Sequence, residues 1–266
     1  MKVEKIEVSN MGNALRGMRN PKKSWNKSDS ISALINLNND NSDLIVTDYW
    51  MNSLGYKKDN QKMYKKINQS LIKNGTLQLS PFTQTANVCF IGPKDMKLAQ
   101  SLIKAGPEHR KFMRQIFVSM DLTAPVFLWK EINTYKIFTT ENSTSTMHTI
   151  KNENIDLKRF ETDDYEPSLL IDDVTVGEKI NDFIEFLEKV RKTYLETGDE
   201  RYWKELIRWC PSSWLQTRTF TFNYENAYNM IKQRENHKLS EWHWIINKAL
   251  MKLPYADQFF KLKNII

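Results

Sequence analysis

The spacing of apolar residues changes along the chain, and this change constrains the fold more strongly than any single motif. Residues 1–10 alternate apolar and polar side chains imperfectly, and alternation returns at residues 116–120, so both segments are predicted to be strands. From Ile180 to Tyr194 the apolar residues recur every three or four positions, which predicts a long amphipathic helix. Strands mostly in the first half and helices concentrated in the second half indicate an α+β fold.

Start and stop signals place the helices. Thr175 and Glu178 have the spacing of a capping box at the start of the long helix, and Gly198 ends it. The same kinds of signal predict shorter helical segments near residues 14–19, 93–106, 110–115, 124–132 (as a helix or a buried segment), 200–209, 226–236 and 239–251.

One region departs from these patterns. Residues 31–89 are rich in asparagine and lysine, and we interpret them as an insertion with a helix near residues 60–73 and a hairpin after Gly75. No internal repeat is present, so a single domain over residues 1–266 is the simplest organisation.

Composition excludes several classes of site. The chain has only eight glycines and neither a G-x-G-x-x-G nor a G-x-x-x-x-G-K motif, which argues against dinucleotide-binding and P-loop folds. Its two cysteines form no C-x-x-C pair, and its four histidines show no H-x-x-x-H spacing, so no metal site is expected.

The charge balance favours an anionic ligand. A formal net charge of +7 suits a nucleotide, a nucleic acid or a membrane surface, but the lysines are spread along the chain in pairs such as Lys22-Lys23 and Lys57-Lys58. Nucleic-acid binding is therefore the weaker alternative. With no signal-peptide pattern and no apolar run near the roughly 20 residues of a membrane span, we expect a cytoplasmic protein without membrane contact.

Two polar stretches stand out, residues 129–148 and 208–244. Hydroxyl, amide and guanidinium groups gather there, and such groups suit a pyrimidine and its phosphate because arginine forks match phosphate oxygens. The alternative is a set of polar caps at the starts of helices.

The order and spacing of these segments carry a family resemblance. Asn223 follows Pro211 by twelve residues, Arg234 follows Asn223 by eleven, and "HKLSEW" comes next. Upstream, "AGPEHRKF", "IFVSMDL" and "EINTYKIFTTENSTSTMH" follow one another. In this order the chain resembles the flavin-dependent thymidylate synthases (ThyX type) over residues 1–30, 90–150 and 205–245. Residues 31–89 and 151–200 have no clear counterpart in that pattern.

The resemblance implies a central, mostly antiparallel sheet flanked by helices, with a helix-rich C-terminal half. It also implies FAD held between the subunits of a homotetramer, hydride and one-carbon transfer to the pyrimidine nucleotide dUMP, and use of a reduced folate and NADPH. By that resemblance the catalytic residues are Ser145, Arg234 and His109; the cofactor contacts are Thr134, Tyr135, Lys136, Asn142 and His109; and the substrate contacts are Arg208, which is one residue out of register, Arg234, Ser145 and His148.

Three departures from the family pattern change what is expected. Thr134-Tyr135-Lys136 replaces an Arg-His-Arg motif, and Met147 and Glu225 each stand where the family has an arginine. Lysine cannot reproduce the two-pronged arginine contact, and each lost charge-assisted hydrogen bond removes about 1.5–3 kcal/mol. Weak FAD binding is expected. The alternative function is a catalytically inactive nucleotide-binding or regulatory protein, with residues 31–89 as a partner surface.

Overall fold

The computed structural model describes residues 1–36 and 85–261. They form two compact units that interleave in sequence, and each is described by itself. The first unit contains Met1–Glu4, Met120–Phe220 and Lys238–Glu241, and the second contains the remaining described residues. The helix near residues 60–73 and the hairpin after Gly75 lie outside the described residues. The single domain over residues 1–266 stays a prediction.

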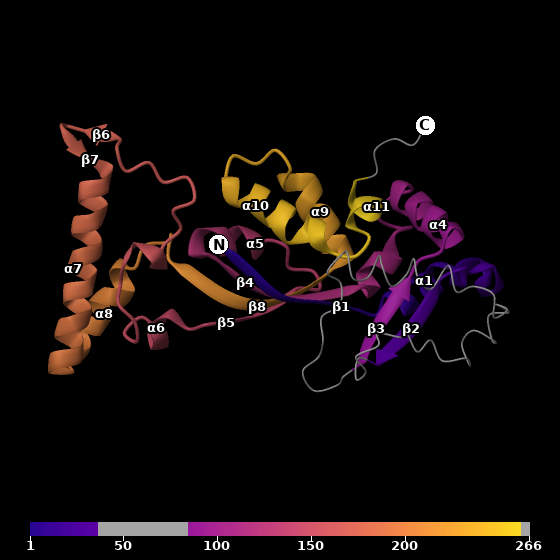
Figure 1. The fold of residues 1–266 in the computed structure, drawn as a ribbon, viewed down its shortest axis with the longest axis horizontal. Helices are drawn as coiled ribbons and strands as arrows, with labels where there is room; N and C mark the ends of the chain where they lie inside the picture. Colours follow the sequence, from indigo (N-terminus) through magenta and orange to yellow (C-terminus); the bar gives the residue numbers. More distant parts are fainter. Residues whose placement is uncertain (37–84, 262–266) are drawn as a thin grey trace. The chain divides into compact units, whose positions relative to one another are not determined.

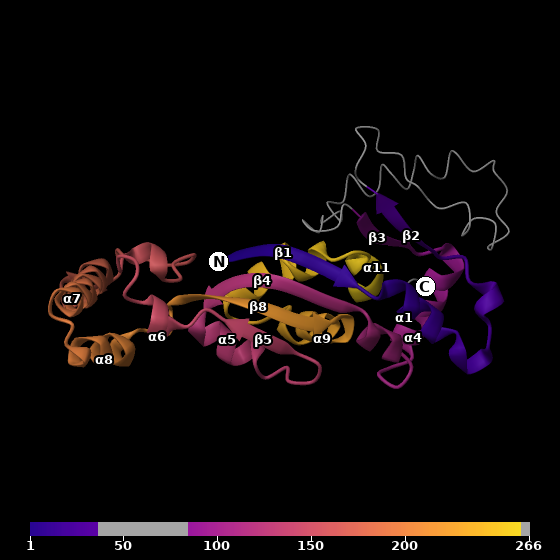
Figure 2. The same ribbon diagram turned by 90° about the horizontal axis from the view of Figure 1, so that it is seen from below.

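A four-stranded antiparallel sheet flanked by helices confirms the predicted α+β class (Figures 1 and 2). Its strands, in spatial order, are β1 (Lys2–Ser9), β4 (Phe117–Pro125), β8 (Leu215–Asn223) and β5 (Thr140–Ser143). The two predicted strands became β1 and β4. Neither β8 nor β5 was predicted, and β8 lies between the helices predicted at residues 200–209 and 226–236.

The long helix of the first unit begins as the sequence predicts. The hydroxyl of Thr175 accepts from the backbone N–H of Glu178, whose carboxylate accepts in return from the backbone N–H of Thr175, a complete capping box. Gly198 ends the helix with a φ of 67°, a conformation that glycine adopts without strain. The helices and strands of this unit besides the sheet are α5 (Val126–Ile132), α6 (Thr146–Thr149), η4 (Leu157–Arg159), β6 (Leu170–Ile171), β7 (Val174–Thr175), α7 (Val176–Thr197) and α8 (Glu200–Trp209).

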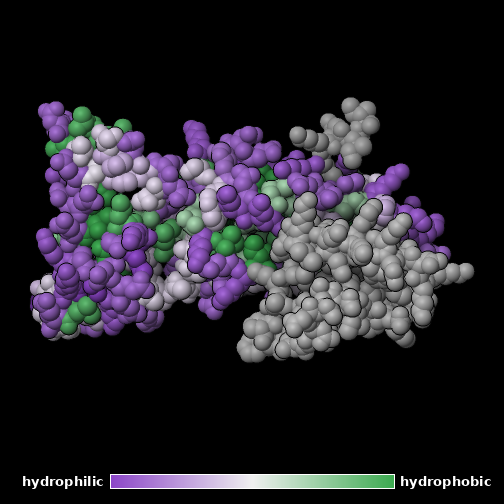
Figure 3. Space-filling view, in the orientation of Figure 1, coloured by the Kyte–Doolittle hydropathy of each residue, from purple (hydrophilic) through white to green (hydrophobic). Residues whose placement is uncertain are grey.

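Burial of apolar side chains holds α7 and α8 side by side (Figure 1). The cluster between them and the neighbouring loops consists of Ile150, Ile155, Phe160, Ile184, Leu187, Leu206 and Trp214. At the tip of the β6–β7 hairpin, Leu169, Leu170 and Ile171 are exposed, and the upper left of Figure 3 shows this apolar tip in green.

The second unit contains most of the remaining helices. The helix predicted at residues 226–236 begins two residues earlier, and the one predicted at 239–251 divides into α10 and a short 3-10 helix. These elements are α1 (Met11–Met18), η1 (Asn20–Lys22), η2 (Trp25–Lys27), β2 (Ile31–Asn36), β3 (Thr85–Phe90), α4 (Pro93–Lys104), η3 (Lys111–Gln115), α9 (Tyr224–Arg234), α10 (Ser240–Lys248), η5 (Leu250–Lys252) and α11 (Ala256–Phe260). The first two residues of α10 belong to the first unit. Strands β2 and β3 form an antiparallel ribbon. No helix among the described residues is long and apolar enough to cross a lipid bilayer.

A buried ion pair fixes the segment after α1 to α4. Arg19 donates to Oδ1 of Asp95 at 2.6 Å and 2.5 Å, and both side chains are almost wholly buried. The hydroxyls of Ser28 and Ser30 donate to Oδ2 of the same carboxylate at 2.5 Å and 2.6 Å. Asp29 accepts from two backbone N–H groups in the first turn of α4. Because every oxygen of Asp95 has a donor, the buried charge is compensated.

Candidate functional site

The most elaborate polar cluster of the first unit is built on β8. Gln216 and Arg218 lie two positions apart on this strand, so their side chains point to the same face of the sheet. Nε and Nη2 of Arg218 donate to Oε1 of Gln216 at 3.0 Å and 2.7 Å, and Nη1 donates to Oε1 of Glu141 on β5. The arginine side chain is only 13% exposed, so these contacts fix its orientation.

Trp129 of α5 provides the surface on which this arginine lies. The guanidinium carbon of Arg218 is 4.6 Å from the Trp129 ring centroid, which is within the range of a cation–π contact. The indole N–H donates to the backbone carbonyl of Gln216 at 3.0 Å, and Phe220 packs edge-on against the same ring. We call Trp129, Glu141, Gln216 and Arg218 the Arg218 site.

The Arg218 site keeps unused hydrogen-bonding capacity. Oε2 of Glu141 is buried, and no donor among the described residues reaches it. Both terminal nitrogens of Arg218 retain a further N–H beyond the bonds described above. A buried polar atom without a partner is costly, so a donor that reached this oxygen after a movement of the surrounding side chains would be stabilised here.

The hydroxyl-rich segment after β5 continues from this site. Thr144 donates to the backbone carbonyl of Thr217 through its N–H and its hydroxyl, at 2.9 Å and 3.1 Å. The amide of Gln216 donates in turn to the Thr144 carbonyl at 2.7 Å. Ser145, next in the chain, is half-buried and stands at the start of α6, with His148 exposed one turn later. Asn142 is exposed on β5 and, by strand alternation, points away from the face that Glu141 uses.

The segment predicted to contact FAD lies in turns after α5. Thr134 donates its hydroxyl to the Glu131 carbonyl at 2.7 Å, and Tyr135 is half-buried. Lys136 is exposed and has no ion pair among the described residues. Ile137 and Phe138 follow it, 74% and 65% exposed. The donor set therefore fits one phosphate group, whereas the diphosphate of FAD carries two.

Arg208 lies near the end of α8. It forms an ion pair with Glu205, one turn earlier on the same helix, and its side chain is 53% exposed. The neighbouring Trp209 donates to the same carboxylate at 2.9 Å. An exposed pair of this kind leaves the guanidinium accessible to a ligand but does not fix its orientation.

The second unit contains His109 and Arg234. His109 is exposed in the turn after α4, and Arg234 is half-buried with its guanidinium carbon 5.0 Å from the Trp242 ring centroid. The residue that resembles the family's asparagine has a structural role, because Asn223 caps α9 in a reciprocal pair with Asn226.

Glu225 is the acceptor of a second arginine cluster. Arg110 donates to its Oε1 at 3.0 Å, and Arg114 donates to its Oε2. Arg110 also donates to Asn229 at 3.3 Å and lies 4.5 Å from the ring centroid of Tyr228. The carboxylate is 10% exposed and lies in the first turn of α9, where the helix dipole favours a negative charge. Two arginines on one carboxylate leave a net positive charge.

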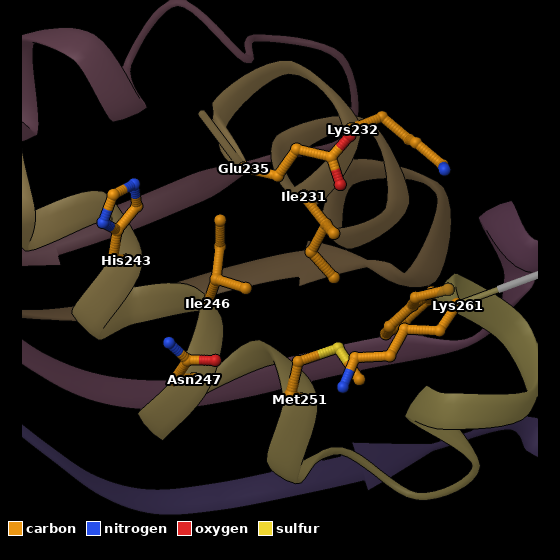
Figure 4. Close-up of a pocket in the computed structure, with 9 residues that line it drawn as sticks. Ile231, Lys232, Glu235, His243, Ile246, Asn247, Met251 and Lys261 are labelled. Atoms are coloured by element: carbon orange, nitrogen blue, oxygen red, sulfur yellow. The ribbon is translucent and has the colours of Figure 1, made fainter. Parts of the chain in front are cut away.

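A separate surface pocket lies on α9, α10, η5 and α11 (Figure 4). Its volume is about 420 Å³. Ile231, Ile246 and Met251 point toward its middle in Figure 4, while charged and polar side chains stand around the rim. None of the residues that the sequence predicts to be functional lines this pocket.

The acidic loop after Phe160 is mostly solvated, as an ordinary charged loop would be. Asp163, Asp164 and Glu166 are exposed. Glu241, however, is 4% exposed, and its Oε2 has no hydrogen-bond donor among the described residues. Burial raises the pKa of Glu241, and the nearby Glu161, Asp164 and Asp163 raise it further. A hydrogen bond from the backbone N–H of Glu241 itself lowers this pKa but does not outweigh burial. No group of three or more histidines, cysteines or carboxylates in the described part of the chain could hold a metal ion.

Comparisons with known proteins add a likeness of fold. No family model matches the sequence, and no curated protein matches it. One similar solved structure is the flavin-dependent thymidylate synthase ThyX from Helicobacter pylori complexed with FAD and dUMP, at 14% identity over 98% of each chain and a TM-score of 0.57. Another, of ThyX from the same organism with FAD and dUMP, has 15% identity, 98% coverage of each chain and a TM-score of 0.56. The chain therefore has a ThyX-like fold.

Proposed function

We propose that this chain is a divergent flavin-dependent thymidylate synthase-like protein that binds dUMP and FAD. The likeness to two ThyX structures that hold both ligands, extending over 98% of each chain, is the observation that carries the proposal. In this proposal His109, Ser145 and Arg234 act in catalysis, Arg208 and His148 contact the nucleotide, and the active form is a homotetramer.

The Arg218 site supports recognition of a pyrimidine ring. Uracil presents an N–H between two carbonyl groups, so it can donate to the free oxygen of Glu141 and accept from Arg218. Cytosine can satisfy the same two groups with its amino group and ring nitrogen. The relative affinities for dUMP and dCMP would therefore show whether the Arg218 site prefers uracil or cytosine.

The fit to FAD is partial. Thr134, Asn142 and Lys136 supply hydroxyl, amide and one cation, and the exposed Phe138 supplies an aromatic surface. FAD would supply hydride transfer when bound. Because one lysine stands for two arginines in the motif, we expect an FAD affinity about 10- to 160-fold below that of a protein with the full motif, from about 1.5–3 kcal/mol for a charge-assisted contact.

The test begins with the visible spectrum of the purified protein before and after FAD is added. We expect a flavin spectrum that dUMP perturbs, and formation of dTMP when reduced folate and NADPH are supplied. Arg218→Lys should weaken dUMP binding because lysine loses the fork, whereas Arg201→Lys, at an exposed arginine on α8, should not. A protein that binds neither FAD nor dUMP would refute the proposal.

One observation favours a second function, nucleotide binding without turnover. Glu225 stands where the resembling family has an arginine, and both arginines near it are engaged with its carboxylate. This alternative would be established if the protein bound dUMP but formed no dTMP at any concentration of added FAD. Loss of that binding in Arg234→Ala would strengthen it, and an unchanged affinity in this variant would count against it.

A further inference from the structure

A short basic surface follows α1 in the second unit. Between Glu7 and Asp29 the sequence contains no acidic residue, and Arg16, Lys22, Lys23 and Lys27 are all exposed. Arg19, the remaining cation of this stretch, is buried on Asp95 and does not contribute to the surface. We call residues 19–30 the Trp25 loop, after the aromatic residue at its centre.

The Trp25 loop is held at both ends by the same carboxylate. Arg19 enters from one end and bonds to Oδ1 of Asp95, while Ser28 and Ser30 bond from the other end to Oδ2. Arg19 also reaches back to the Ser24 carbonyl at 3.4 Å. Between these points the short 3-10 helices η1 and η2 order the backbone. The surface charges are therefore carried on a fixed frame.

Trp25 is fixed as well, although it is 43% exposed. Its indole N–H donates to the side-chain oxygen of Asn20 at 2.9 Å. The guanidinium carbon of Arg16 lies 5.4 Å from the ring centroid, which adds a cation–π contact. An exposed tryptophan side chain is normally mobile. The ring of Trp25 is instead held in one orientation by Asn20 and Arg16, and much of its surface stays accessible to a ligand.

We infer that the Trp25 loop is a binding surface for single-stranded nucleic acid. Exposed lysines and an arginine suit a phosphate backbone, and a fixed aromatic ring offers a face on which an unpaired base can stack. A duplex keeps its bases stacked internally and could use only the charges. An anionic membrane fits less well, because the other exposed residues of the Trp25 loop are asparagines and lysines, with Pro21 as the one further exposed apolar residue within residues 19–30.

This inference does not depend on dUMP or FAD binding, since the Trp25 loop shares no residue with the proposed contacts of either ligand. The measurement is fluorescence anisotropy of a labelled single strand of about 16 nucleotides, DNA or RNA, titrated with the full chain across a salt series. The parent protein should bind with an affinity that falls as salt rises, by roughly 0.7 log unit per log unit of salt for each phosphate contacted.

Three variants and a control separate stacking from charge. Trp25→Ala should weaken binding about 5- to 100-fold, and Trp25→Phe should retain most of the affinity, because stacking needs a ring. Replacing Lys22 and Lys23 together by glutamine should reduce the salt slope. Replacing Lys189 and Lys192 on α7, which are also exposed, by glutamine makes the same change in net charge and should leave binding unchanged.

Several outcomes would overturn the inference. Equal loss in the α7 control would mean that total charge, and not the Trp25 loop, drives binding. Equal affinity for duplex and single strands, with no effect of Trp25→Ala, would exclude stacking. Binding to vesicles with phosphatidylserine but not to oligonucleotides would assign the surface to a membrane. If excess dUMP or FAD displaced the oligonucleotide, the two sites would not be separate.

Discussion

Asp95 and Glu141 are both carboxylates paired with a largely buried arginine, yet their surroundings differ. Asp95 receives donors on both oxygens from Arg19, Ser28 and Ser30. Glu141 receives Arg218 on one oxygen, and its other oxygen is buried without a donor among the described residues. A fully satisfied ion pair contributes only to the fold, whereas a half-satisfied one can gain stability from a ligand. The difference separates a structural pair from a candidate binding pair.

The largest expected effect is on the structural pair. Asp95→Ala leaves Arg19 buried without its partner, so the free energy of unfolding should fall by about 3–5 kcal/mol. Chemical denaturation measures this, with Asp257→Ala, which removes an exposed pair to Lys261, as the control expected to change stability by less than about 1 kcal/mol. If Asp95→Ala lowered the free energy of unfolding by no more than Asp257→Ala does, the assignment of Asp95 and Arg19 as a structural pair would be wrong.

The same carboxylate predicts an acid dependence. Burial alone raises the pKa of Asp95, but hydrogen bonds from Ser28, Ser30 and Arg19 outweigh it and hold the pKa below its ordinary value. A lowered pKa in the folded state contributes stability above the unfolded pKa of about 4, and this contribution is lost as the pH falls through the folded pKa. Unfolding measured between neutral and strongly acidic pH should show the cost of Asp95→Asn shrinking in acid.

The next effect concerns the half-satisfied pair. Arg218→Ala should reduce dUMP affinity about tenfold or more, from a charge-assisted contact of about 1.5–3 kcal/mol. Titration calorimetry of the nucleotide with the parent and the variant provides the test. Arg201→Ala, an exposed arginine paired with Asp199, is the matched control. A variant that folds and binds dUMP like the parent would show that the unused capacity of Glu141 and Arg218 is not for this ligand.

Glu241 extends the comparison to a carboxylate with like-charged neighbours. Its pKa is raised, so the stability linked to its bound proton is present below the unfolded pKa and is lost as the pH rises through the folded pKa. Glu241→Gln should therefore stabilise the protein near neutral pH, by about 0.5–2 kcal/mol, with a smaller gain in acid. Thermal unfolding of the parent and the variant, measured near neutral pH and in acid, tests this expectation. Glu196→Gln, at an exposed position, is the control and should show no such pH-dependent gain in stability.

How far the sequence predicts this structure depends on whether a signal is local. The capping box and the α7 helix were predicted because both depend on residues within a few positions of one another. Strand β8 was not predicted, because its inward face contains Gln216 and Arg218 as well as Phe220 and Phe222, and the two polar residues interrupt the apolar alternation. The pairing of Glu141 with Arg218 joins residues 77 positions apart, so no local pattern indicates it.

The site predictions divide in the same way. The resemblance assigned roles to Ser145, His148 and Asn142 in the hydroxyl-rich segment but did not include Glu141, one position from Asn142. The period-two spacing of Gln216, Arg218 and Phe220 is the signal that could have placed a strand, and then Arg218, beside that segment. The roles of the predicted residues stay predictions until binding is measured.

The attachment of the Trp25 loop to Asp95 has a consequence for biosynthesis. The loop emerges from the ribosome well before Asp95, which lies 76 residues after Arg19. Until the later segment has been translated and α4 has docked, neither end of the loop has its anchor. The ordered basic surface therefore requires a chain that extends through α4, and a nascent chain that ends before Asp95 lacks it.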